Sequence, residues 1–226
     1  MFPRNGYYCF IYFTYIVLGV GCFPLNNEFK PTISSATPEP LTIEDIFYFA
    51  SSSNYMQECI SVYPNKISDQ ASYKGIFPGI SSEQDVENSL GVPVSKNNAF
   101  IQSWEYKGDP VVVFEDEQVE SIWVYKDTNI ILPLRQFVSN YGCPDLIIAY
   151  DTNQHPVSEY AMSSLIYLTL GLEINFYTFP VKLEQKPDFV IFLQQESMME
   201  YLIRMRDTLE MPNKAKPVTW DEVITE

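Results

Sequence analysis

The sequence predicts an α+β fold in which two tandem modules, each a helix followed by two or three strands, build an antiparallel sheet with helices packed on one face. A repeated helix stop carries this prediction, because Leu90-Gly91-Val92-Pro93 and Tyr141-Gly142-Cys143-Pro144 have the same order. In each stop, a glycine just past the last apolar residue ends a helix, and a proline two residues on cannot continue it. Aromatic residues make up 15% of the chain and suit the strands that follow.

The first module has the order helix, strand, strand, acidic turn, strand. Ser81 or Ser82 caps its helix, in which Val86 and Leu90 lie four residues apart on one face. The strands are marked by Trp104 and Tyr106 between polar residues, by the run Val111–Phe114, and, after Glu115-Asp116-Glu117, by Val119, Ile122 and Val124.

The second module repeats this order more loosely. Its helix is predicted by four apolar residues at the spacing i, i+3, i+4 and i+7, which places them on one stripe. These residues are Leu134, Phe137, Val138 and Tyr141. The module continues with Leu146–Tyr150 and an apolar segment around 165–170. Strands are predicted over 172–176 and 189–193, and a short helix over Met198–Met205.

The first residues are typical of an exported chain. One basic residue, Arg4, precedes an apolar run, and the small residues Gly19 and Gly21 stand just before Cys22. This layout resembles the signal of bacterial lipoproteins, in which the cysteine is acylated. It predicts a signal peptide over 1–21 and a lipid anchor at Cys22. An uncleaved membrane anchor and ordinary secretion are the alternatives, because the run is borderline for a bilayer of about 30 Å.

Composition divides the rest of the chain. The stretch after Cys22 is rich in Pro, Ser, Thr and Asn and has little to bury, which is typical of a flexible linker. Thr42 and Asp45 then form a capping box for a first helix. The predicted divisions are the linker over 22–40, the N-terminal helix with the first module over 41–130, the second module with the C-terminal helix over 131–211, and a polar tail over 212–226.

Charge and residue types exclude several classes of function. The chain has 29 acidic and 14 basic residues, a net charge of −15, whereas nucleic-acid binding needs a basic face. No metal or cofactor is expected, because the cysteines form no Cys-x-x-Cys pair and the single histidine, His155, lies in a turn-like stretch. That histidine would have to serve any Ser/His/Asp set, so the chain is predicted not to be an enzyme.

Cys59 and Cys143 remain, besides Cys22, once a signal peptide is removed. Outside the cytoplasm an even pair of cysteines can form a disulfide. Two buried free thiols are the alternative, and the sequence does not decide between them.

The pattern of the first module resembles two known proteins. It is similar to the small outer-membrane lipoprotein of the β-barrel assembly machinery, and to the β-lactamase inhibitor protein, which joins two helix-strand-strand units in tandem. The resemblance implies an extracytoplasmic lipoprotein with that fold, and it covers about a fifth of the chain well. The residues that carry it are Gly79, Val86, Leu90, Gly91, Pro93, Trp104, Tyr106, Phe114 and Val119.

We therefore expect a noncatalytic protein-interaction or scaffold module of the cell envelope, lipid-anchored outside the cytoplasm, with a protein partner. The alternative is an envelope enzyme or a small-ligand-binding protein with its site between the modules. The candidate interaction residues form two pairs spaced by two, so the members of each pair face one side of a strand. They are Trp104 with Tyr106 and Trp123 with Tyr125, and they form either the core under the helices or an exposed patch.

The lipid anchor gives a direct prediction. The full chain should partition with membranes, and Cys22→Ser should release it into the soluble fraction, because the acyl chains supply the membrane affinity. Fractionation of cells that express each form measures this. A Cys22→Ser protein that stays fully membrane-bound would mean that the apolar segment is an uncleaved anchor.

Overall fold

The computed structural model describes residues 42–52, 55–64, 69–98, 101–108, 110–125, 131–150, 162–205 and 215–225, all within one compact unit, Pro38–Glu226. The predicted signal peptide (1–21), the anchor Cys22, the linker (22–40) and His155 lie outside the described residues.

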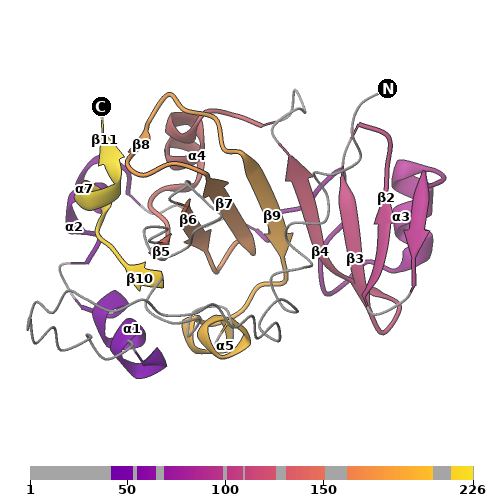
Figure 1. Ribbon diagram of the computed structural model, residues 1–226, viewed down its shortest axis with the longest axis horizontal. Helices are drawn as coiled ribbons and strands as arrows, with labels where there is room; N and C mark the ends of the chain where they lie inside the picture. The colour runs from indigo at the N-terminus through magenta and orange to yellow at the C-terminus, as the bar shows by residue number, and fades with distance from the viewer. Residues whose placement is uncertain are drawn as a thin grey trace, which may run out of the picture. The chain divides into compact units, whose positions relative to one another are not determined.

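An antiparallel sheet runs through the described residues (Figure 1). Its strand order is β1-β2-β3-β4-β9-β7-β6-β5-β10, and each neighbouring pair is antiparallel. The α+β class and the antiparallel sheet are therefore confirmed. The strands are β1 (Ser95–Asn97), β2 (Gln102–Glu105), β3 (Val111–Glu115), β4 (Gln118–Tyr125), β5 (Leu146–Tyr150), β6 (Met162–Tyr167), β7 (Leu172–Phe176), β9 (Phe189–Leu193) and β10 (Ala215–Pro217), with a separate parallel pair, β8 (Val181–Lys182) and β11 (Ile224–Thr225).

The helices begin where the sequence offers a cap. At α1 and α3 the hydroxyl of Thr42 or Ser82 accepts a hydrogen bond from the backbone N–H of Asp45 or Asp85, and that aspartate accepts one from the cap residue in return. The helices are α1 (Ile43–Ala50), α2 (Gln57–Val62), α3 (Glu83–Leu90), α4 (Leu134–Tyr141), α5 (Met198–Arg204) and α7 (Trp220–Val223).

Both predicted helix stops have the expected backbone. Gly91 follows α3 with φ 80°, and Gly142 follows α4 with φ 85°, a region that side-chain-bearing residues rarely adopt. The backbone N–H of each glycine donates to the carbonyl four residues before it, Glu87 or Val138. Glycine is therefore required at both helix ends for the same reason.

β3 and β4 form a hairpin at the predicted acidic turn. Asp116 and Glu117 both have positive φ, 49° and 65°, as a two-residue turn between antiparallel strands prefers. The register then shifts between Val113 and Phe114, which makes Glu120 the extra residue of a β-bulge.

Helices lie on both faces of the sheet. The Tyr167 hydroxyl of β6 donates to the carbonyl of Gly142 at the end of α4, 3.2 Å away, and the Tyr201 hydroxyl of α5 donates to Glu173 Oε2, 3.4 Å away. Tyr167 pairs in register with Leu172, so Glu173, the next residue, points to the opposite face. The prediction that the helices cover one face is therefore wrong.

The central strand β7 gives the physical reason for this correction. The alternating Leu172, Ile174 and Phe176 indicate one apolar face, but all five residues of β7 are buried. Its polar residues Glu173 and Asn175 lie on the second face and are only 6% and 0% exposed. A strand buried on both sides needs a helix on both sides.

α3 covers the same face as α4. Lys96 of β1 pairs in register with Trp104 of β2, and its Nζ lies 2.9 Å from Glu87 Oε1 of α3. Register pairing continues from Trp104 through Val112, Ile122, Phe192 and Leu172 to Tyr167, which contacts α4. We call this side of the sheet the α3–α4 face and the other side the α5 face.

The two predicted modules meet in one continuous sheet. β4, from the region 41–130, pairs with β9, from the region 131–211, over five residue pairs from Ser121↔Leu193 to Tyr125↔Phe189. This register sets which residues of the two regions share the α5 face.

The C-terminal residues differ from the expected polar tail over 212–226. Within the described part, 215–225, β10 pairs with β5 and α7 packs against α2. Val218, Trp220 and Val223 are buried, and the Trp220 ring lies 6.1 Å from that of Tyr63. These three apolar residues pack the segment onto the rest of the fold. They are too few to show a helical or strand periodicity in the sequence, so the sequence alone predicts a polar tail there.

Cys59 of α2 and Cys143, directly after α4, form a disulfide with a Cα–Cα distance of 5.9 Å. Of the two states that the sequence left open, the structure has the bonded one. The bond links residues 84 positions apart, and both cysteines are buried in the core.

Removing both cysteines, as Cys59→Ser with Cys143→Ser, should lower the free energy of unfolding by about 4 kcal/mol, because a long closed loop restricts the unfolded chain. Denaturant unfolding measures the change. Reductant should destabilise the wild type and leave the double variant unchanged. A wild type that is insensitive to reductant once unfolded would show that the cysteines are free thiols.

Candidate functional site

The structure places the two predicted aromatic pairs on opposite faces of the sheet. Trp104, on the α3–α4 face, is 2% exposed, and its ring centroid lies 4.6 Å from that of Phe114. Lys96 Nζ lies 3.6 Å from the Trp104 ring centroid and covers it from the side of α3. Tyr106 is half-buried, and burial followed by the nearby charge of Glu87 raises its pKa to about 12. This pair belongs to the core.

Trp123 and Tyr125 lie on the α5 face and are half-buried. Both contact the buried ring of Phe189, at centroid distances of 5.8 Å in a stacked geometry and 6.0 Å in a tilted one. Tyr177 contacts the same ring at 5.5 Å. We call these four residues, Trp123, Tyr125, Tyr177 and Phe189, the aromatic strip.

Sequence reasoning found two members of the aromatic strip and missed the other two. Trp123 and Tyr125 are two residues apart, which predicts a shared face, whereas Tyr177 and Phe189 are distant in the chain. Phe189 joins them because it pairs in register with Tyr125 across β4 and β9. No local signal in the sequence predicts that pairing.

The neighbouring strands continue the α5 face beyond the aromatic strip. Val111 pairs with Trp123 and is half-buried, as is Val113 two residues on. Glu105 pairs with Val111, and Glu115 lies on the same side as Val113; both glutamates are exposed. Strands β2 to β4 therefore present a partly open surface with apolar centre and acidic edge.

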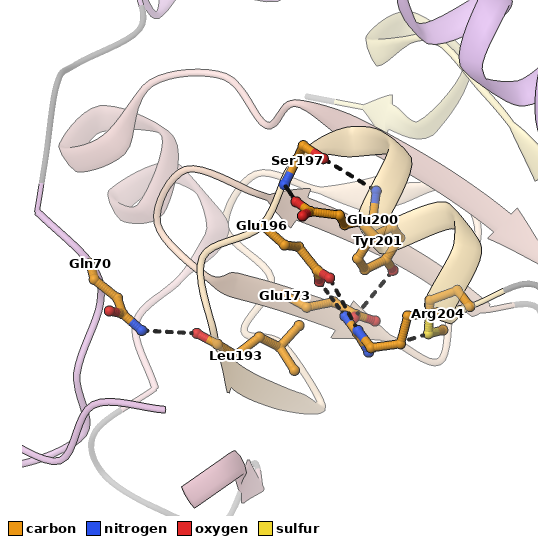
Figure 2. A network of polar contacts seen from close by, with 9 residues as sticks. Gln70, Glu173, Leu193, Glu196, Ser197, Glu200, Tyr201 and Arg204 are labelled. Carbon is orange, nitrogen blue, oxygen red and sulfur yellow. Dashed lines mark hydrogen bonds and ion pairs between the residues drawn. The ribbon is translucent and has the colours of Figure 1, made fainter. Parts of the chain in front are cut away.

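Beneath α5 the same face carries a buried polar cluster. Glu173 accepts a hydrogen bond from Tyr201 (Figure 2). Ser164 donates one to Asn175 Oδ1 at 2.5 Å. At the rim, Arg204 of α5 forms an ion pair with Glu196. We call Glu173, Asn175, Ser164 and Tyr201 the polar cluster.

Burial raises the pKa of Glu173, and this effect outweighs the hydrogen bonds and the Arg204 charge that favour its ionised form. Asn175 lies close enough to Glu173 to favour its ionised form, although its amide nitrogen has no partner among the described residues within strict hydrogen-bond geometry. The gap beside the cluster, lined by Gly171, Leu193 and Tyr201, has no room for a water molecule. Burial under α5 and the hydrogen bond from Tyr201 account for the perturbed carboxyl of Glu173 in structural terms.

A groove of about 320 Å³ lies on the α3–α4 face. Its floor is formed by Leu172 and Phe192, one wall by α4, and the other by residues 69–72. The backbone N–H of Ala71 donates to Leu170 O at 2.8 Å, and Gln70 Nε2 donates to Pro78 O at 2.8 Å and to Leu193 O at 3.4 Å (Figure 2). These bonds fix the second wall.

The described ranges contain no group of three or more His, Cys, Asp or Glu side chains that could hold a metal ion. Nor do they contain a helix long and apolar enough to cross a membrane.

Comparison with known proteins found no matching protein-family model and no match to a curated protein. Two solved structures are weakly similar. One is an extracellular protein containing a SCP domain from Bacillus anthracis, with 12% identity and a TM-score of 0.34 over 70% of this chain and 56% of that one. The other is a DUF4309 family protein (YjgB) from Bacillus subtilis, with 16% identity and a TM-score of 0.31 over 68% of this chain and 95% of that one. At such TM-scores neither carries an argument about this chain.

The polar cluster predicts a pH dependence. A carboxyl whose pKa is raised on folding stabilises the protein below its unfolded pKa, and that contribution is lost as pH rises through the folded pKa. The stability of the wild type relative to Glu173→Gln should therefore fall as pH rises above about 4.5, the unfolded value. Unfolding measured from pH 4 to 8 tests this, with exposed Glu105→Gln as the control that should keep the wild-type profile. A constant difference between wild type and Glu173→Gln would contradict it.

Proposed function

We propose that this protein is a noncatalytic interaction module of the cell envelope, which binds a partner protein on the α5 face through the aromatic strip. The observation that carries the proposal is the position of Trp123 and Tyr125 on the opposite face from Trp104, half-buried, around the buried ring of Phe189. Partly exposed tryptophan and tyrosine on a rigid strand are the residues that most often dominate binding energy at protein interfaces.

The fixed geometry of the strip supports this role. Trp123 is held in place, since its Nε1 donates to Ser121 Oγ at 3.1 Å and its ring stacks on Phe189. Side chains that are already ordered lose little entropy when a partner binds. The half-buried Val111 and Val113 extend the apolar surface on the adjacent strand.

The proposal also includes a location at a membrane, outside the cytoplasm, and an origin of the fold in two tandem modules. A lipid anchor at Cys22 and the linker over 22–40 would hold the module at the outer side of a membrane. The Cys59–Cys143 disulfide supports a location outside the cytoplasm, where such bonds persist. Two tandem modules are supported by the matching stops at Gly91 and Gly142, each after a helix that precedes a run of antiparallel strands.

The groove favours a second candidate, a small-ligand-binding protein. Its volume of about 320 Å³ is at the lower end for ligand pockets, and Phe137, Tyr141 and Phe192 give it aromatic walls beside polar residues 69–72. It lies on the α3–α4 face, away from the aromatic strip. The two candidates therefore depend on separate residues.

Paired tryptophan variants test the proposal. Trp123→Ala should abolish recovery of crosslinked partner proteins from the producing organism while the variant stays folded, with a melting temperature lowered only by the loss of the half-buried ring that stacks on Phe189. Trp104→Phe should lower stability by about 1 to 3 kcal/mol, because it leaves a cavity in the core, and should keep the partner while folded.

Thermal unfolding and crosslinking yield are measured on the same preparations. Trp104→Phe is the matched control, since it removes an indole from the buried face. Recovery of the same partners by Trp123→Ala at the wild-type yield would refute the aromatic strip as the binding surface, and would leave the groove as the remaining candidate.

A further inference from the structure

Acidic side chains predominate among the described charges on the α5 face near the aromatic strip. Register pairing places Glu105, Val111 and Trp123 in one row across β2, β3 and β4. Among the register-paired residues of β1 to β4 and β9 that point to this face, the charged ones are Glu105 and Glu115, and both are exposed. Lys96, the one basic residue of these strands, points to the opposite face and pairs with Glu87.

Two further carboxyl groups lie near these residues. Glu120, the bulge residue of β4, has a raised pKa, caused first by burial and then by the nearby charge of Glu115, while the charge of Arg204 acts in the opposite direction. Asp188 accepts a hydrogen bond from the backbone N–H of Tyr177 at 2.8 Å, so a carboxylate also lies at the other end of the strip. Arg204, the cation of α5 on this side, forms an ion pair with Glu196. The chain as a whole has a net charge of −15.

We infer that the partner bound at the aromatic strip is a basic protein segment, which places an arginine side chain over Trp123 and pairs it with Glu105. This inference rests on the proposed function and names the chemistry of its partner. A guanidinium stacks on an indole face and forms hydrogen bonds to a carboxylate at the same time, whereas an ammonium does the first less well.

The spacing suits such a side chain. Glu105 and Trp123 are separated by the single residue Val111, which is two strand spacings, or about 10 Å between backbones. The long glutamate side chain reaches part of that distance, so a guanidinium above Val111 contacts both. Glu115 and Glu120 then attract further basic residues and raise the association rate.

The test uses the purified full chain and fluorescein-labelled hexaarginine as the probe, with binding followed by fluorescence anisotropy at 50 mM salt. Glu105→Gln with Glu115→Gln should weaken binding by about tenfold, and Trp123→Ala by a similar factor, since each removes one half of the contact. The matched control, Glu44→Gln with Glu58→Gln, removes two exposed charges from α1 and α2 and should change the Kd less than twofold.

Hexalysine should bind the wild type more weakly than hexaarginine, because an ammonium group contacts an indole face less favourably than a planar guanidinium and cannot pair bidentately with a carboxylate. Equal losses in the two double variants would overturn the inference, because the probe would then respond to net charge alone. Failure of the wild type to bind hexaarginine would also overturn it. The two double glutamine variants should keep the wild-type melting temperature, since the glutamates are exposed.

Recovery of the cellular partner by the same variants tests the proposed function separately from the inference about a basic partner. If Glu105→Gln with Glu115→Gln recovers the cellular partner at the wild-type yield while Trp123→Ala does not, the aromatic strip is a binding surface for a partner that is not basic. If neither variant loses the partner, both the inference and the proposed function fail.

Discussion

The register between β4 and β9 is the constraint on which the rest of the structure depends. Five residue pairs join these strands, and a slip of one residue would move Trp123 and Tyr125 to the α3–α4 face. It would also separate Tyr125 from Phe189, around which the aromatic strip is arranged. The pairing joins the N-terminal and C-terminal parts of the chain into one sheet, so the candidate binding surface cannot form from either part alone.

Burial on both sides of the sheet follows from this continuity. β7 lies next to β9 and is covered by α4 on one face and by α5 on the other. The face under α5 is where Glu173 and Asn175 are buried, and the pKa of Glu173 is raised there because the carboxyl has left water. The aromatic strip lies on the same face, where Trp123, Tyr125 and Tyr177 are half-buried. The same face therefore carries both the buried polar cluster and the surface proposed for binding.

Local features of the fold could be predicted from the sequence. The capping boxes at Thr42 and Ser82 and the glycine stops at Gly91 and Gly142 depend on residues within a few positions of each other. The acidic turn at Asp116 likewise marks where β3 meets β4. Such signals give the elements and their order.

The arrangement of the elements could not be predicted in the same way. Alternation shows which residues of a strand share a face, but not which face a helix covers, so Trp104 and Trp123 looked equivalent. Glu173 has the position of an ordinary surface charge in Leu172–Phe176, and only α5 makes it buried. Phe189 joins the candidate site through the pairing of β4 with β9, and Tyr177 through its contact with the Phe189 ring. No local sequence pattern predicts these long-range contacts.

The most direct test of this account measures the exposure of the indole groups by NMR with a soluble paramagnetic probe. The account predicts that the Trp123 indole N–H signal is broadened strongly while that of Trp104 is protected, and that Trp123 shows a nuclear Overhauser contact to the Phe189 ring 5.8 Å away. Protection of Trp123 to the same degree as Trp104, or absence of its contact to Phe189, would contradict the register of β4 on β9 and the open aromatic strip that depends on it.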